Sequence, residues 1–257
     1  MDELRQDDSS KLIKLLLLMG ENYIKSGAEI WRVEDMLSRV GYAYGAREVN
    51  AFVITSCIFL TITYSDGHIE TQTKRIKRGA TDLRKLEWLN SLSRKICKDK
   101  ISLTDFEKEL LTIISRKEDK KELFIGSILI GGAFALFFGG NVVDIILSAL
   151  VGIIVCLLQI YVEPLCMNAI AYKFVGSFIT GSIISMITKL VSGAHQDIIM
   201  IADIMILIPG IMFTNSLRDV LLGDTLSGIL RFVEAALLAC AVVVGFVASM
   251  FLFGGKL

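Results

Sequence analysis

The chain has 257 residues, of which 53% are hydrophobic, and its mean hydropathy of +0.61 is too high for an ordinary soluble domain of this size. The 27 Lys and Arg residues are balanced by 27 Asp and Glu residues, which excludes the strong positive field of a nucleic-acid-binding protein. Most charged residues lie before Glu122 and apolar runs dominate after it. This change predicts a domain boundary near residue 120.

Cysteine and histidine give no sign of a bound metal. The five cysteines include no CxxC pair, and the only histidines are His68 and His195, far apart in the sequence. Zinc and haem sites need clustered ligands of these types. We therefore expect neither a metal site nor a cofactor.

Two helices are predicted at the start of the chain. Residues 10–26 suit a helix with Ser9 or Ser10 at its N-cap, and Gly27 is placed to end it in the left-handed conformation. Residues 28–44 carry apolar side chains at three- and four-residue spacing, and Gly45 follows as a stop signal. The apolar run of residues 12–19 is short, interrupted by Lys14 and preceded by acidic residues, so we expect a helix of the soluble domain and not a signal peptide.

A small antiparallel sheet is predicted next. Residues 49–64 are rich in β-branched and aromatic side chains, Ser65-Asp66-Gly67-His68 suits a hairpin turn, and residues 69–76 alternate in polarity. Thr81 and Asp82 can cap a further helix, and Thr104-Asp105-Phe106-Glu107 reads as a capping box for another. Residues 1–120 are thus predicted to form an α+β domain.

The acidic residues of this domain do not form a recognisable catalytic set. Glu29, Glu34, Asp35 and Asp66 are the candidate acid and base groups, but no nucleophile elbow, phosphate loop or metal spacing accompanies them. We expect them to serve on helix surfaces and in turns, and we do not expect an enzyme.

Residues 121–257 are predicted to form an all-α membrane bundle of about five spans, since a span needs about 20 mostly apolar residues. Lys173 interrupts the third span, and Ser148-xxx-Gly152 and Gly181-xxx-Ser185 suit close helix contacts. The predicted spans are residues 123–140, 142–162, 164–187, 198–217 and 226–253.

The basic residues of the short loops predict the orientation. With the N-terminus in the cytoplasm, only Lys189 and Lys256 lie outside, and the residues on the cytoplasmic side are Arg116, Lys117, Lys120, Lys121, Lys173, Arg218 and Arg231. The chain is thus expected to be a multi-pass protein of the cell membrane with its N-terminus in the cytoplasm. Because an odd number of spans cannot form two equal inverted halves, a second copy or a smaller partner is expected.

Charged residues inside apolar runs mark the candidate transport site, because a charge at mid-span costs about 2.5–3.5 kcal/mol on insertion scales. Asp203 is the clearest case, and Pro209-Gly210 interrupts the same run six residues later. Asn215 and Asp219 follow, and Arg231 and Glu234 share one face of the last helix. Arg231 either holds an anionic substrate or neutralises Glu234, and the loop charges are equally consistent with ion pairs at the membrane surface.

In their order and spacing these features resemble the threonine/serine exporter family, specifically its N-terminal, large-subunit type, including the large subunit of the two-component succinate exporter. The matching residues are Gly27-Ala28-Glu29, Arg32-Val33-Glu34, Gly45, the strands of 49–63, Asp66-Gly67, the stretch 75–82, Pro209-Gly210, Asn215, Asp219, Gly223-Asp224, Gly228 and Arg231. The resemblance implies a secondary exporter of small polar metabolites, either threonine and serine or dicarboxylates such as succinate. It also implies a smaller, separately encoded membrane subunit as partner.

An alternating-access mechanism follows as a hypothesis. The substrate carboxylate lies at the broken fourth span and Arg231, and Asp203 or Glu234 is the proton-coupling acid. The competing hypothesis is a membrane-anchored sensor or scaffold whose front domain binds a partner. Five spans with an internal Asp203 argue against it, since one span is enough for an anchor.

Overall fold

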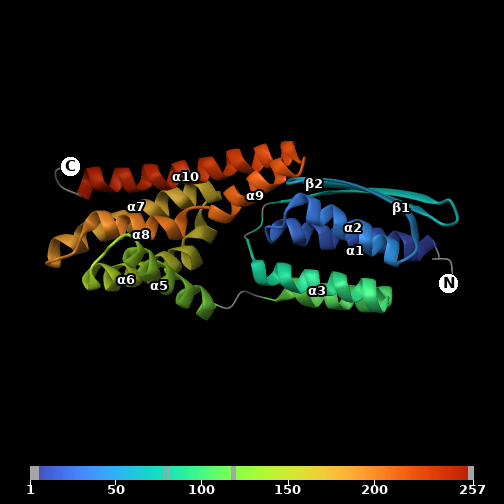
Figure 1. The fold of residues 1–257 in the computed structure, drawn as a ribbon, viewed down its shortest axis with the longest axis horizontal. Coiled ribbons are helices and arrows are strands. Elements are labelled where there is room, and N and C mark those ends of the chain that lie inside the picture. The colour runs from blue at the N-terminus through green and yellow to red at the C-terminus, as the bar shows by residue number, and fades with distance from the viewer. Residues whose placement is uncertain (1–5, 78, 80, 117–119, 254–257) are drawn as a thin grey trace. The chain divides into compact units, whose positions relative to one another are not determined.

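The computed structural model describes residues 6–77, 79, 81–116 and 120–253 (Figure 1). Contacts divide the chain into two compact units: Met1–Lys117 with Ile211–Phe232, which we call the front unit, and Glu118–Gly210 with Val233–Leu257, which we call the helical unit. Lys117, Lys256 and two positions of the 75–82 stretch, Arg78 and Ala80, lie outside the described residues. The elements are α1 (Gln6–Lys25), α2 (Ile30–Ala43), β1 (Ala46–Ile54), β2 (Cys57–Tyr64), β3 (Ile69–Arg75), α3 (Leu83–Asp99), α4 (Leu103–Ser115), α5 (Lys120–Phe137), α6 (Val142–Tyr161), a 3-10 turn (Glu163–Leu165), α7 (Ala169–Leu190), α8 (Gln196–Leu207), α9 (Gly210–Leu221) and α10 (Thr225–Phe253).

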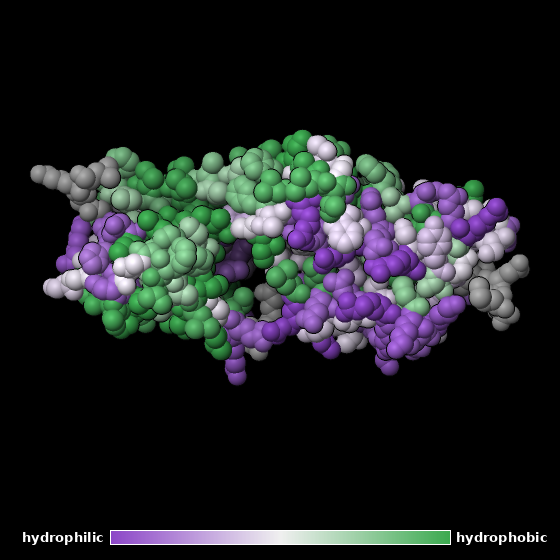
Figure 2. Space-filling model, in the orientation of Figure 1, coloured by the Kyte–Doolittle hydropathy of each residue, from purple (hydrophilic) through white to green (hydrophobic). Residues whose placement is uncertain are grey.

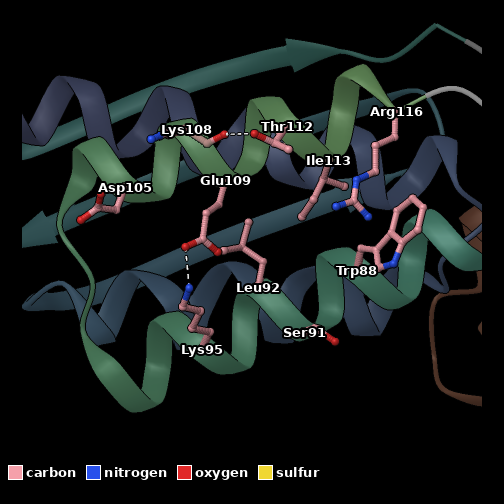
Figure 3. A pocket seen from close by; sticks show the side chains of 10 residues that line it. All are labelled: Trp88, Ser91, Leu92, Lys95, Asp105, Lys108, Glu109, Thr112, Ile113 and Arg116. Carbon is pink, nitrogen blue, oxygen red and sulfur yellow. Dashed lines mark hydrogen bonds and ion pairs between the residues drawn. The ribbon is translucent and has the colours of Figure 1, made fainter.

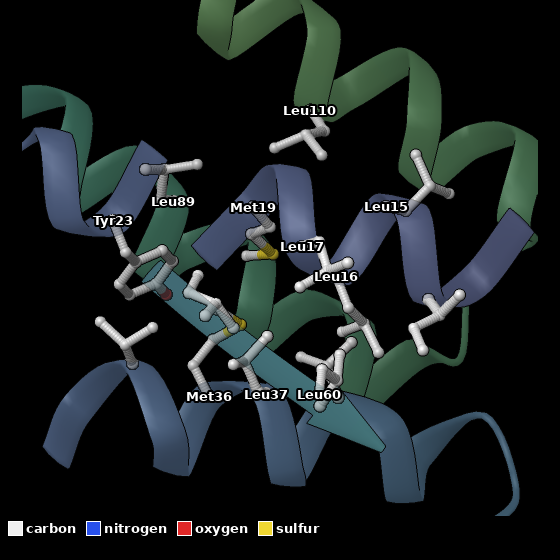
Figure 4. Close-up of a cluster of buried hydrophobic side chains, with 14 of the residues drawn as sticks. Leu15, Leu16, Leu17, Met19, Tyr23, Met36, Leu37, Leu60, Leu89 and Leu110 are labelled. Atoms are coloured by element: carbon white, nitrogen blue, oxygen red, sulfur yellow. The ribbon is translucent and has the colours of Figure 1, made fainter. Parts of the chain in front are cut away.

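The front unit has three layers, with α1 and α2 between the sheet and the α3–α4 pair (Figure 1). Helix α1 therefore has neighbours on both sides, which explains why its apolar residues surround it instead of forming a single stripe. Leu12, Ile13, Leu16 and Met19 are all completely buried. Figure 4 shows this core, where side chains of α1 meet those of α2, β2, α3 and α4. The early apolar run is thus the central helix of the front unit.

The sheet confirms the predicted antiparallel strands and divides them further. Its order is β1-β2-β3, and the run predicted as residues 49–64 turns at Thr55-Ser56, so that Ile54 pairs with Cys57. Along β2, Ile58, Leu60 and Ile62 point into the core at every second position. The predicted turn between β2 and β3 is also present, with Gly67 at a φ of +86°.

The helix ends agree in part with the sequence prediction. Gly27 and Gly45 have positive φ angles, as expected for residues that end helices. Asp82, not Thr81, caps α3 by accepting a hydrogen bond from the Lys85 backbone N–H at 2.8 Å. The predicted capping box at Thr104 is wrong, because Ser102 caps α4.

Three described helices are long and apolar enough to cross a membrane: α6 with its 3-10 extension (Val142–Leu165), α7 and α10. The pair α8 and α9 becomes a fourth candidate if both count as one broken span. On the face drawn in Figure 2, apolar side chains cover much of the outer surface of the helical unit. The chain is a membrane protein with three or four candidate spans.

The predicted spans differ from the helices at two places. Helix α5 begins with Lys120, Lys121 and Glu122, which leaves 15 of its 18 residues for the apolar part, fewer than the ~20 that a span needs. The predicted third span, residues 164–187, starts too early. The chain first forms the short 3-10 turn around Pro164, and α7 begins only after Asn168, whose side chain caps it.

Small residues allow α5 and α6 to pack backbone against backbone. A Cβ built on Gly131 would lie 2.6 Å from the Ser148 carbonyl oxygen, and a Cβ on Gly152 would meet the Ser127 carbonyl in the same way. Each helix therefore offers a glycine to a serine of the other, in antiparallel order. The Ser148-xxx-Gly152 prediction is confirmed, and its partner is Ser127-xxx-Gly131.

A second crossing of this kind joins α7 to α10. Gly181 faces Ser249 and Gly245 faces Ser177, so these two helices pack in parallel order. The predicted motif was Gly181-xxx-Ser185, but Gly181 instead acts with Ser177, one turn earlier. Parallel packing requires that one crossing of the membrane lies between α7 and α10, which suits a broken α8–α9 span.

Gly131→Ala should destabilise the helical unit by about 1–3 kcal/mol, because the added methyl group forces apart two backbones that have no room to move. Gly126→Ala on the same helix is the matched control, since a Cβ there meets no atom within 4 Å. Thermal unfolding of the two purified variants in detergent measures the difference. Equal unfolding temperatures would contradict the tight crossing.

Candidate functional site

The predicted site residues belong to two groups. Asn215, Asp219 and Arg231 pack in the front unit, whereas Asp203 and Glu234 belong to the helical unit. Each group is described by itself, and Pro209-Gly210 stands at the break between α8 and α9.

Asp203 is the buried carboxylate of the helical unit. Its residue is 0% exposed, and its Oδ2 accepts a hydrogen bond from the Ser148 hydroxyl of α6 at 3.1 Å. Its Oδ1 has no hydrogen-bond partner among the described residues and lies beside the bare Cα of Gly131. A carboxylate with a single partner in such surroundings is costly to keep charged. Binding a proton removes that cost.

The break at Pro209-Gly210 is confirmed and has a local cause. Helix α8 ends at Leu207, and Ile208 adopts extended angles of −69° and 134°, as expected for a residue that precedes proline. Pro209 has no N–H to continue the helix. Gly210 does not have a positive φ and a Cβ on it meets no atom within 4 Å, so the proline accounts for the break.

Asn215, Asp219 and Arg231 all contact the turn between α1 and α2, residues 27–30. The Asn215 amide donates to the Gly27 carbonyl at 2.8 Å, and the Arg231 guanidinium donates to the Ala28 carbonyl at 3.1 Å. Asp219 Oδ1 accepts from the backbone N–H of Ile30, the first residue of α2, at 3.2 Å. We call these three side chains and the turn the turn clamp.

The turn clamp supplies the N-terminal cap that the residues next to α2 do not provide. Glu29 stands at the N-cap of α2, but its side chain makes no capping hydrogen bond. Asp219 takes that role from 189 residues away, where a carboxylate also suits the positive end of the helix dipole. Glu29 instead pairs with Arg32 at 3.3 Å and with Arg218.

The Arg231 side chain is buried and bonded within the turn clamp. The residue is 7% exposed, and its Nη1 lies 3.4 Å from Asp219 Oδ2 within the front unit. Arg231 thus forms an ion pair with Asp219 through Nη1, and its Nη2 donates to the Ala28 carbonyl. Removing one partner of a buried ion pair strongly destabilises a protein, because the other partner is left as an uncompensated buried charge.

Sequence reasoning missed a second buried carboxylate, Asp144, which is 0% exposed in the helical unit. It forms a capping box with Asn141 at the start of α6, and it accepts hydrogen bonds from both the backbone N–H and the ring Nδ1 of His195, at 2.8 and 2.9 Å. The Asn141 amide also donates to the Gly193 carbonyl at 2.7 Å. The signal was available: Asn141-x-x-Asp144 has capping spacing and follows a Gly-Gly pair.

Two candidate acids of the front unit accept hydrogen bonds from backbone N–H groups, and of these Asp66 has the predicted turn role. Glu34 accepts from the Val53 backbone N–H at 2.9 Å, and burial raises the pKa of its carboxyl. Asp66 accepts from the His68 N–H within the hairpin turn. Across the described ranges, no three His, Cys, Asp or Glu side chains come together as a metal site would require.

A shallow groove of about 430 Å³ lies between α3 and α4 (Figure 3). The Arg116 guanidinium sits 4.4 Å from the centre of the Trp88 ring at one end, and Lys95 pairs with Glu109 at 2.5 Å further along. Its charges are of both signs, and none of the predicted site residues lines it.

Arg231→Ala should destabilise the front unit by about 3 kcal/mol or more, because Asp219 would keep a buried charge and Ala28 would lose a donor. Arg47→Ala, on the exposed edge of β1, is the control and should stay within about 0.5 kcal/mol. Thermal unfolding of the full chain in detergent measures both. An unchanged unfolding temperature for Arg231→Ala would show that the guanidinium is not structural.

Comparison with known proteins identifies the family of the chain. Residues 14–253 match the family described as "Putative threonine/serine exporter". Two curated relatives, both called "Probable succinate transporter subunit YjjP", are each 23% identical: that of Klebsiella aerogenes over 243 residues (90% of each chain) and that of Escherichia coli K12 over 263 residues (98% of each). No solved structure matches.

The family match covers both the turn clamp and the buried Asp203. The chain thus belongs to the threonine/serine exporter family and is distantly homologous to succinate transporter subunits.

Proposed function

We propose that this chain is the larger subunit of a secondary exporter that moves small carboxylate-bearing metabolites out of the cell in exchange for protons. The candidate substrates are threonine- and serine-type amino acids and dicarboxylates such as succinate. The observation that carries the proposal is Asp203, a fully buried carboxylate with one hydroxyl partner inside an apolar helical unit. Residues of this kind mark proton relays and ion pathways in membrane proteins.

A partner subunit follows from the span count and from the relatives. To the three or four candidate spans we add α5, whose apolar part is short, because it packs backbone against backbone on the span α6. With α8 and α9 taken as one broken span, the count is five. Five spans do not divide into two equal inverted halves, and both relatives are named as subunits. A smaller membrane subunit of the same family, a second copy of this chain, or both complete the transporter.

The substrate carboxylate is placed at the start of α9, after Pro209-Gly210, where a helix N-terminus favours an anion. Within the front unit, Asn215 and Asp219 of α9 and Arg231 of α10 hold the α1–α2 turn through the turn clamp. Asp203 couples transport to proton movement, with Glu234 as the alternative acid.

Asp203→Asn should lower efflux driven by a pH gradient by about tenfold or more, because the amide cannot bind and release a proton. Glu122→Gln is the control: it also replaces a carboxylate by an amide in the helical unit, at an exposed position. Cells producing the chain with its small membrane subunit are loaded with serine- or threonine-containing dipeptides or with succinate, and release is measured.

Two results of that experiment would count against the proposal. If Asp203→Asn and Glu234→Gln both retained normal proton-dependent efflux, neither acid would be the coupling group. If the unaltered chain released none of the metabolites, the sensor or scaffold hypothesis would replace the exporter.

The predicted orientation can be tested by thiol labelling. In a variant whose five native cysteines are replaced by alanine, Ser192→Cys should react with an impermeant maleimide in intact cells, whereas Met167→Cys should react only after permeabilisation. Ser192 lies in the α7–α8 loop and Met167 just before α7, both exposed. The reverse labelling pattern would place the N-terminus outside.

A further inference from the structure

A row of polar groups runs from the surface into the helical unit. Asp144 and Ser148 stand one helical turn apart on α6, and both residues are completely buried on the side that faces α8. Asp144, which is bonded to His195, and Ser148, which is bonded to Asp203, thus lie on one face of α6. Apolar neighbours such as Val151 and Val155 continue the same face.

The outer end of this row is His195, whose side chain is 54% exposed. The hydrogen bond and the charge of Asp144 raise the pKa of its imidazole, and Asp197 of its own helix adds to the effect. From the neighbouring α7, the Ser185 hydroxyl accepts a hydrogen bond from the Gln196 amide at 3.1 Å. The buried positions of α5 are Ser127, Gly131 and Ala135, and none of these three is charged. His195 therefore binds a proton from solvent more readily than a free histidine.

The inner end is Asp203. The Ser148 hydroxyl already donates to Asp203 Oδ2, so Ser148 can pass its own proton to Asp203 when it accepts another on its oxygen. The step from Asp144 to Ser148 covers one helical turn, a rise of about 6 Å, which a water molecule can bridge.

We propose that His195, Asp144 and Ser148 form the proton route by which Asp203 exchanges its proton with solvent, an inference that rests on the proposed proton-coupled export. A proton binds the His195 imidazole and passes to the Asp144 carboxylate, and a bridging water then carries it to the Ser148 oxygen. As Ser148 accepts this proton it releases its own hydroxyl proton to Asp203, so that His195, Asp144 and Ser148 each return to their starting state. With the N-terminus in the cytoplasm, the loops that carry Asn141 and His195 face the outside. Protons thus enter from the side toward which metabolites leave.

Infrared spectroscopy of the purified full chain tests this route without a transport assay. The carbonyl band of a protonated Asp203 is assigned by its loss in Asp203→Asn, and its shift after transfer to D2O gives the rate of proton exchange. His195→Gln and Ser148→Ala should each slow that exchange about tenfold or more. His68→Gln is the matched control, because it removes the other histidine of the chain, which lies in the front unit.

The outcomes separate the two proposals. Equal exchange rates in His195→Gln, Ser148→Ala and the unaltered chain would overturn the route and leave Asp203 as a proton-binding group. Absence of any band that Asp203→Asn removes, at every pH tested, would overturn Asp203 as the coupling acid itself. Slow exchange in both variants with a normal rate in His68→Gln would support the route.

Discussion

A polar side chain inside an apolar protein needs a partner, and this requirement organises both units. In the helical unit it pairs Asp203 with Ser148 and Asp144 with His195, which joins α6 to α8 and to the loop before it. In the front unit it pairs Asp219 with Arg231, which joins the segment after the helix break to the α1–α2 turn. Unpaired, each group would cost several kcal/mol. The proposed coupling group, Asp203, has one hydrogen-bond partner among the described residues.

Close packing of backbones creates the setting for these pairs. The α5–α6 crossing depends on Gly131 and Gly152, and the α7–α10 crossing on Gly181 and Gly245. Lipid gives no hydrophobic drive for helices to associate, so van der Waals contact between small residues has to supply it. Because Gly131 has no side chain, Asp203 Oδ1 can lie against α5, and the proposed proton site is built on the same crossing that holds the helices together.

Some features of the fold can be predicted from the local sequence, whereas two helix caps could not. The proline break, the Gly27 and Gly45 helix ends and the antiparallel sheet follow from local rules, and all are present. Two overlapping patterns have the spacing of a cap, Ser102 with Asp105 and Thr104 with Glu107, and the prediction of Thr104 was wrong because the helix begins at Leu103. Asp144 was missed because it stands at the start of an apolar run, where a capping role draws no attention.

The sequence by itself determined the two classes of region, the break at Pro209 and the position of Asp203 within an apolar run, because hydropathy and backbone chemistry act over a few residues. Only the tertiary structure decided what Asn215, Asp219 and Arg231 contact. Their partners lie 188 to 203 residues away in the chain, at a turn whose helix has no cap of its own. No local pattern encodes such a pairing, since it arises when two distant segments are packed together and their buried polar groups must be satisfied.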